Sequence, residues 1–264
     1  MDYNFDIERT QALSACKRMK SFYTDLKNLY TKHSIDLEAN RGRRNVLMSA
    51  PMEKFLAEEM NTCGLYKSVL NDGRTGCADI LVVLKSGENI ELECKLTSPT
   101  QSSGSIAFQT DHDTLMQKGS LDYVYIIADE DFEKFCVIHF KGLTVDDFRG
   151  LSPGARGKVQ MFKYHGMKKA NVLVGEAISS TDVKLAKIRS AYKQRIIEAT
   201  DEATAWKQNL QDMPISKKYE RSKLAAQITR AQNKCDDYLN KMAEEIKIAQ
   251  EMKARYTFLY EDIK

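Results

Sequence analysis

The most strand-like stretch of the sequence, GCADILVVLKSGENIELECKL at residues 76–96, contains Asp79, Glu91, Glu93 and Lys95. Alternate side chains of a strand share a face, so Glu91, Glu93 and Lys95 should project together, while the apolar residues between them enter a core. A tight turn between two strands would bring Asp79 beside Glu93 and Lys95. This stretch therefore predicts a cluster of carboxylates with one ammonium group.

Such a cluster suits a metal ion. Two carboxylates about 4 Å apart repel each other by roughly 4 kcal/mol at an effective dielectric constant near 20, and one lysine offsets only part of this. Hard oxygen ligands without His or Cys favour Mg²⁺ over zinc. Mg²⁺ beside a lysine suits phosphodiester hydrolysis, because the metal polarises the phosphate and acidifies a bound water that the lysine helps to orient. The alternative is an exposed edge strand whose charges are solvated, although the neighbouring strands are too apolar for an edge.

The elements that must position this cluster are predicted from periodicity and turn signals. Helices are expected over 6–33, 49–64 and 106–119, and strands over 65–71, 77–84, 89–96, 122–128 and 134–140. From the second helix onward the order is α-β-β-β-α-β. This order favours an α/β fold with a mixed sheet flanked by helices and one helical crossover to a buried strand.

Asp79 followed by Glu-Cys-Lys at residues 93–95, in this order of elements, resembles the PD-(D/E)XK nuclease superfamily and most of all type II restriction endonucleases. The resemblance covers roughly residues 45–140 and implies a restriction-endonuclease-like core. Ala78 stands where the family name has proline, a departure that many members share.

The resemblance also implies roles for individual residues. Asp79 and Glu93 would bind the metal, and Lys95 would be the catalytic lysine. Glu53 matches an acidic residue that many members carry on the preceding helix, but it is equally suited to a charge interacting with a helix start. Glu91 is an additional acid, so the choice between Glu91 and Glu93 stays open.

By this resemblance the protein is a Mg²⁺-dependent, type II site-specific deoxyribonuclease that hydrolyses phosphodiester bonds of double-stranded DNA. Cleavage of both strands needs two active sites, so we expect a homodimer. A repair or recombination nuclease with the same core is one alternative. A DNA-binding module without catalysis is another, against which the intact Asp79, Glu93 and Lys95 argue.

Candidate DNA contacts fall in two segments rich in glycine and arginine, both expected to be loops. They are Arg41, Arg43 and Arg44 in the first segment, and Arg149, Arg156 and Lys158 in the second. Arginine pairs with phosphates or guanine edges, and glycine lets a loop follow a groove. Gln109, one turn into the helix predicted over 106–119, could approach the site. Solvated surface charge is the alternative for all of these residues.

The composition changes near residue 176, beyond which no Gly occurs and Pro214 is the only Pro. Apolar residues from Leu224 to Tyr256 step by three and four, which predicts a long helix with a coiled-coil-like seam. We therefore divide the chain into a nuclease core over 1–175 and an all-helical subdomain over 176–264. This subdomain is expected to dimerise or to clasp DNA. Basic residues that precede the seam could contact phosphates: Lys217, Lys218, Arg221 and Lys223.

Composition adds weaker constraints. The net charge of +3 is compatible with nucleic-acid binding without indicating it. The six cysteines form no C-x-x-C pair, so they lack the usual zinc spacing and suggest free thiols in a reducing compartment. No apolar run approaches a membrane span and the N-terminus has no apolar signal core, so a cytoplasmic protein without a membrane partner is expected.

Overall fold

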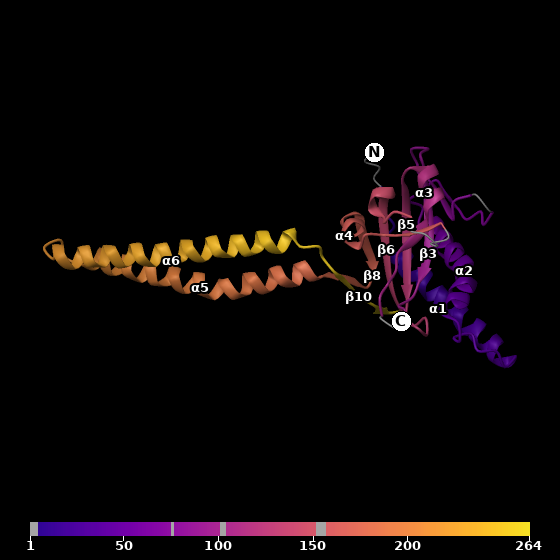
Figure 1. Ribbon diagram of the computed structural model, residues 1–264, viewed down its shortest axis with the longest axis horizontal. Coiled ribbons are helices and arrows are strands. Elements are labelled where there is room, and N and C mark those ends of the chain that lie inside the picture. Colours follow the sequence, from indigo (N-terminus) through magenta and orange to yellow (C-terminus); the bar gives the residue numbers. More distant parts are fainter. Residues whose placement is uncertain (1–4, 75–76, 101–103, 152–156) are drawn as a thin grey trace. The chain divides into compact units, whose positions relative to one another are not determined.

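The computed structural model describes residues 5–74, 77–100, 104–151 and 157–264. The chain divides into two compact units: Met1–Ala177 together with Phe258–Lys264 form unit 1, and Ile178–Thr257 form unit 2. The predicted boundary at 175/176 lies within two residues of this division. The last residues were predicted in the helical subdomain but belong to unit 1, because the final strand pairs with the central sheet. Figure 1 shows the order of the elements along the chain.

In the described residues, the centre of unit 1 is a seven-stranded mixed sheet of order β1-β2-β3-β5-β6-β11, with β8 also paired to β6. The strands are β1 Ser68–Leu70, β2 Ile80–Val83, β3 Asn89–Thr97, β5 Leu121–Ala128, β6 Lys134–Leu143, β8 Ala170–Val174 and β11 Glu261–Asp262. β3 and β5 are parallel, whereas the other neighbours are antiparallel. The predicted mixed sheet with one crossover to a buried strand is therefore confirmed.

Smaller elements complete the chain. Two short pairs lie outside the main sheet, β4 Gln109–Asp111 with β7 Lys158–Gln160, and β9 Glu176–Ser179 with β10 Tyr256–Leu259. The helices are α1 Arg9–Lys32, α2 Arg41–Thr62, α3 His112–Lys118, α4 Lys163–Gly166, α5 Ser180–Asp212 and α6 Lys218–Glu251, with 3-10 turns at Val145–Asp147 and Met167–Lys169. Among the helices of these described segments, none is both long enough and apolar enough to cross a membrane.

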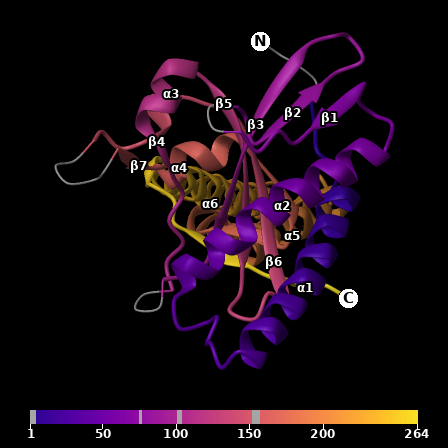
Figure 2. The same cartoon turned by 90° about the vertical axis from the view of Figure 1, so that its right-hand side faces the viewer.

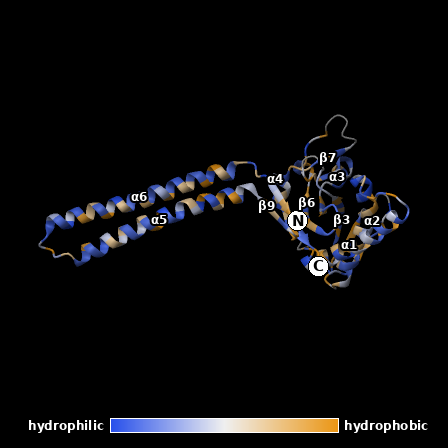
Figure 3. Cartoon of the chain, turned by 90° about the horizontal axis from the view of Figure 1, so that it is seen from below, coloured by the Kyte–Doolittle hydropathy of each residue, from blue (hydrophilic) through white to orange (hydrophobic). Residues whose placement is uncertain are grey.

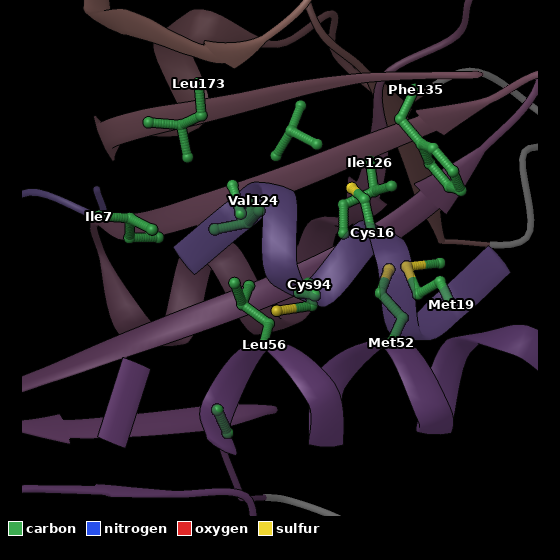
Figure 4. Packing of buried hydrophobic residues seen from close by; sticks show 14 of the residues in the cluster. Ile7, Cys16, Met19, Met52, Leu56, Cys94, Val124, Ile126, Phe135 and Leu173 are labelled. Atoms are coloured by element: carbon green, nitrogen blue, oxygen red, sulfur yellow. The ribbon is translucent and has the colours of Figure 1, made fainter. Parts of the chain in front are cut away.

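Two helices cover one face of the sheet. Figure 2 shows α1 and α2 crossing in front of the strands. The residues that meet in this core include Cys16 and Met19 of α1, Met52 and Leu56 of α2, and Cys94, Val124 and Ile126 of the sheet (Figure 4). Burying these side chains removes their apolar surface from water at roughly 25 cal/mol per Å², which fixes α2 against β3. The site described below depends on that contact.

Several helix boundaries differ from the prediction, and three of the differences are substantial. α2 begins at Arg41, where the Asn40 side chain accepts a hydrogen bond from the Arg43 amide, and not at Ser49. The helix continues through Pro51 because residues on both sides of it are buried in the core. α3 begins later than predicted, at His112. α6 ends at Glu251, so Tyr256 lies in β10 and outside the helical seam.

Unit 2 is a helical hairpin, in which α5 and α6 lie side by side (Figures 1 and 3). The predicted seam of α6 packs on α5 near Ile188. Its contacts are formed by Leu185, Ile188, Tyr192 and Ala249, with Ile196, Tyr238, Met242 and Ile246 packed around them. The Tyr192 hydroxyl also donates a hydrogen bond of 2.7 Å to Glu245. The hairpin thus buries much of its own apolar stripe.

Candidate active site

The site lies at a fork in the sheet. β2 pairs with β3 from Val83↔Asn89 to Ile80↔Leu92, and β3 then continues to Thr97 with β5 as its paired neighbour. Just before β2, Asp79 turns its carboxylate toward the edge of β3 that β2 leaves open. Oδ2 of Asp79 accepts a hydrogen bond of 2.8 Å from the Cys94 amide. A backbone amide that has lost its strand partner needs such an acceptor, so the fork itself orients Asp79.

Lys95 joins the two predicted metal ligands. Its Nζ donates to Oε2 of Glu93 at 2.7 Å and to Oδ2 of Asp79 at 3.4 Å. All three side chains are partly buried, with 30% of Lys95, 17% of Glu93 and 25% of Asp79 exposed. Desolvation lowers the pKa of Lys95, but Glu93 and Asp79 outweigh it and leave that pKa raised. Lys95 therefore remains an ammonium ion and cannot act as a base near neutral pH.

Glu53 belongs to the same electrostatic environment. Burial and, after it, the negative charge of Asp79 raise the pKa of Glu53 to about 7, although Lys95 acts in the opposite direction. Glu53 lies more than three turns after the start of α2, so the interpretation as a helix-start charge is wrong. The residue reaches the fork because α2 packs on β3.

Glu91 is separated from this group. Although it shares a face of β3 with Glu93, its carboxylate forms an ion pair of 2.7 Å with Lys118 of α3. A carboxylate already paired with its own lysine has less need of a metal ion. The geometry thus favours Glu93 over Glu91 as the partner of Lys95, a choice that the sequence left open.

Asn71 is a residue of the site that the sequence analysis missed. Its Nδ2 donates a hydrogen bond of 2.7 Å to the backbone carbonyl of Asp79, and its side chain also lowers the pKa of Glu53. Asn71 therefore holds the segment before β2 and favours the ionised form of Glu53. In the sequence it stands at the end of a weak strand followed by Asp and Gly, a pattern typical of an ordinary turn.

The donor set suits a hard cation. The carboxylates of Asp79 and Glu93 contact the ammonium group of Lys95, and Glu53 interacts electrostatically with all three. Within the described parts of the chain, no three His, Cys, Asp or Glu side chains are grouped closely enough to hold a metal ion by themselves. A cation here would have two close carboxylates, and water or phosphate oxygens would complete its shell. Mg²⁺ is commonly bound in this way, and Ca²⁺ or Zn²⁺ prefers more protein ligands.

The predicted basic loop of Arg41, Arg43 and Arg44 is helical. Arg41 donates to the carbonyl of Pro99 at 3.1 Å and pairs with Glu130. Arg44 is 1% exposed, with its guanidinium bonded to Ser98 at 3.0 Å and to the Glu130 carbonyl. Arg44 therefore holds α2 in place and has no surface for a DNA contact. Arg43 is the exposed member of the three.

The other candidate DNA contacts lie in different elements. Gln109 is exposed in β4, so its prediction as a helical residue is wrong, and its carbonyl accepts a hydrogen bond of 2.9 Å from Tyr125. Lys158 is exposed at the start of β7, opposite Asp111. Arg149 is exposed and lies 5.9 Å above the Phe162 ring. Arg156 lies outside the described residues.

Comparison with known proteins finds no matching family model, no matching curated protein and no matching solved structure.

Proposed function

We propose that the protein is a Mg²⁺-dependent endodeoxyribonuclease of the PD-(D/E)XK type, which cuts double-stranded DNA at specific sequences as type II restriction endonucleases do. The observation that carries this proposal is the hydrogen-bonded group of Asp79, Glu93 and Lys95 at the fork between β2 and β3. The order α2-β1-β2-β3-α3-β5, with β3 parallel to β5, supports a restriction-endonuclease-like core.

Each residue of the group has a distinct task in this proposal. Bound between Asp79 and Glu93, Mg²⁺ would supply polarisation of the scissile phosphate and a more acidic coordinated water. Lys95 keeps its positive charge, so it holds a phosphate oxygen and stabilises the negative charge that develops in the transition state. Its hydrogen bonds to Asp79 and Glu93 hold the Lys95 ammonium group in position.

Glu53 is suited to proton transfer. In the protein without metal its pKa is about 7, so it exists in both the carboxylate and the carboxylic acid form near neutral pH, and a bound cation would favour the carboxylate that accepts a proton. A group of this pKa both accepts a proton from an attacking water and releases it again, which is the condition for efficient general base catalysis. The Asn71 side chain counteracts part of the rise that burial causes by lowering the pKa of Glu53.

Incubation of the purified protein with plasmid DNA tests the proposal. We expect discrete fragments with Mg²⁺ and none with EDTA. Lys95→Ala and Glu93→Gln should each lower the cleavage rate at least about a hundredfold. Glu91→Gln is the matched control, because it removes a carboxylate from the same face of the same strand.

The outcomes separate the rival functions. Selective nicking of branched or damaged DNA would indicate a repair or recombination nuclease, and plasmid that stays intact would refute catalysis. Lys95→Ala should still bind DNA and melt cooperatively. If it does not melt cooperatively, Lys95 serves the fold and our assignment fails. Sedimentation should show a homodimer, because cutting both strands requires two active sites.

A further inference from the structure

The end of the helical hairpin in unit 2 carries exposed side chains that the fold does not use. We define the hairpin tip as residues 206–224, which comprise the end of α5, the connection and the start of α6. Arg221 closes this turn, since its NH1 donates to the carbonyls of Leu210 at 2.9 Å and Met213 at 2.6 Å. These carbonyls lie at the C-terminal end of α5 and would otherwise lack a helical partner. Arg221 is therefore a structural residue, not the free phosphate contact that the sequence suggested.

Two apolar side chains stand out at this tip. Ile215 is 81% exposed and Tyr219 is 83% exposed, more than any other large hydrophobic residue in the described part of the chain. Their neighbours in the sequence line a cavity of about 570 Å³, whose apolar lining consists of Trp206, Met213, Pro214 and Leu224. The seam residues of the hairpin are buried elsewhere, between α5 and α6. Apolar side chains gathered in this way at an exposed end indicate a contact surface.

Positive charge surrounds these side chains. The tip contains Lys207, Lys217, Lys218, Arg221 and Lys223 against Asp212 and Glu220. Its net charge is thus five minus two, or +3, equal to the net charge of the whole chain. Lys217 forms an exposed ion pair of 3.3 Å with Glu220. Within the described residues, no carboxylate pairs with Lys218 or Lys223.

We propose that the hairpin tip is a second DNA-binding surface, where Lys217, Lys218 and Lys223 contact phosphates and Tyr219 packs on a sugar or a base. Lysines beside an exposed aromatic ring match the chemistry of nucleic acid, which offers phosphate charge next to flat apolar faces. The proposal rests on the proposed function for the identity of its ligand. It extends that function, because the tip contacts are independent of base sequence and of the residues that carry the chemistry.

The lysines are tested by the salt dependence of binding. A fluorescent DNA duplex is titrated with the full-length protein in EDTA, so that binding is measured without cleavage. Each phosphate contact adds about 0.9 to the slope of log affinity against log salt, so Lys217→Gln/Lys218→Gln/Lys223→Gln should reduce the slope by about 2.7. Between 50 and 200 mM salt, wild-type affinity should therefore fall about 40-fold more than that of the variant. The control, Lys187→Gln/Lys193→Gln/Lys247→Gln, removes the same charge from exposed positions on the hairpin body and should keep the wild-type slope.

Tyr219 is tested in the same titration. Tyr219→Ser should weaken binding by about fivefold or more at every salt concentration, because a ring stacked on a base or sugar contributes without releasing counterions. Its slope should equal that of the wild type. Circular dichroism and a cooperative melt establish that both tip variants keep the hairpin folded.

The result that overturns the proposal is an unchanged slope and affinity in folded tip variants. Vesicles of phosphatidylserine provide the second arm. If the tip variants lose vesicle binding while DNA binding is unchanged, the tip contacts an anionic membrane surface and the proposal is wrong. A wild type that binds DNA through the tip but never cleaves it would refute the proposed function alone. If the tip variants cleave DNA and bind it as the wild type does, the proposal for the hairpin tip alone is refuted.

Discussion

Replacement of Glu53 by glutamine should change how stability depends on pH. In the folded protein without metal, burial and the charge of Asp79 raise the pKa of Glu53 from the ordinary 4.5 to about 7. A carboxyl group whose pKa is higher in the folded protein favours the folded state when the pH is below its pKa in the unfolded chain. That contribution is lost as the pH rises through the pKa of the folded state. The wild type should therefore lose stability between about pH 4.5 and pH 7.

The size of this loss follows from the two pKa values. At 1.36 kcal/mol for each unit of pKa difference, this shift corresponds to roughly 3 kcal/mol of unfolding free energy. Glu53 is half-buried, so water screens its charge in part, and some of the loss has already occurred by about pH 5. We therefore expect a loss of about 2 kcal/mol between about pH 5 and about pH 8.5 that Glu53→Gln does not show.

Chemical unfolding in EDTA at the two pH values measures this difference. Glu88→Gln, which removes a carboxylate from the exposed turn between β2 and β3, controls for the loss of charge as such. Mg²⁺ should restore wild-type stability at the higher pH, because a bound cation favours the ionised carboxylate. If Glu53→Gln and the wild type lose equal stability over this range, Glu53 does not share the environment of Asp79 and our description of the site is wrong.

Three other predictions follow from single contacts. Asp79→Asn should weaken Mg²⁺ binding, measured by calorimetry, at least about tenfold, in keeping with the cost of disturbing a metal shell. Glu91→Gln should change Mg²⁺ affinity less than about threefold. Equal effects of the two substitutions would contradict the separation of the two acids. Met242→Asp places a charge in the seam between α5 and α6. It should lower the free energy of unfolding by about 2 kcal/mol or more, seen as a lower melting temperature. Gly175→Ala should destabilise unit 1 by about 2 kcal/mol or more, because its φ is +74° and a Cβ would clash with the Leu259 carbonyl oxygen. A melt unchanged from the wild type would show that the C-terminal strand can move away.

Several features could be predicted from the sequence because they depend on local periodicity. The alternation along β3 placed Leu92 and Cys94 in the core and Glu93 and Lys95 on the other face, as the structure shows. The same reasoning identified the hairpin between β2 and β3, since a turn around Gly87 allows few registers. The approach of Asp79 to Lys95 followed from that register.

Only the tertiary structure decided which distant groups meet. Glu91 pairs with Lys118 and Glu53 enters the fork, because the packing of α3 and α2 on the sheet determines which side chains approach β3. Arg44 looked like a surface charge in a polar segment, yet the packing of α2 buried it. The pairing of β11 with β6 could likewise not be predicted from the sequence, since strand pairing between remote segments leaves no periodic signal in either segment. Local sequence thus determined which face a residue occupies, whereas long-range packing determined its partner.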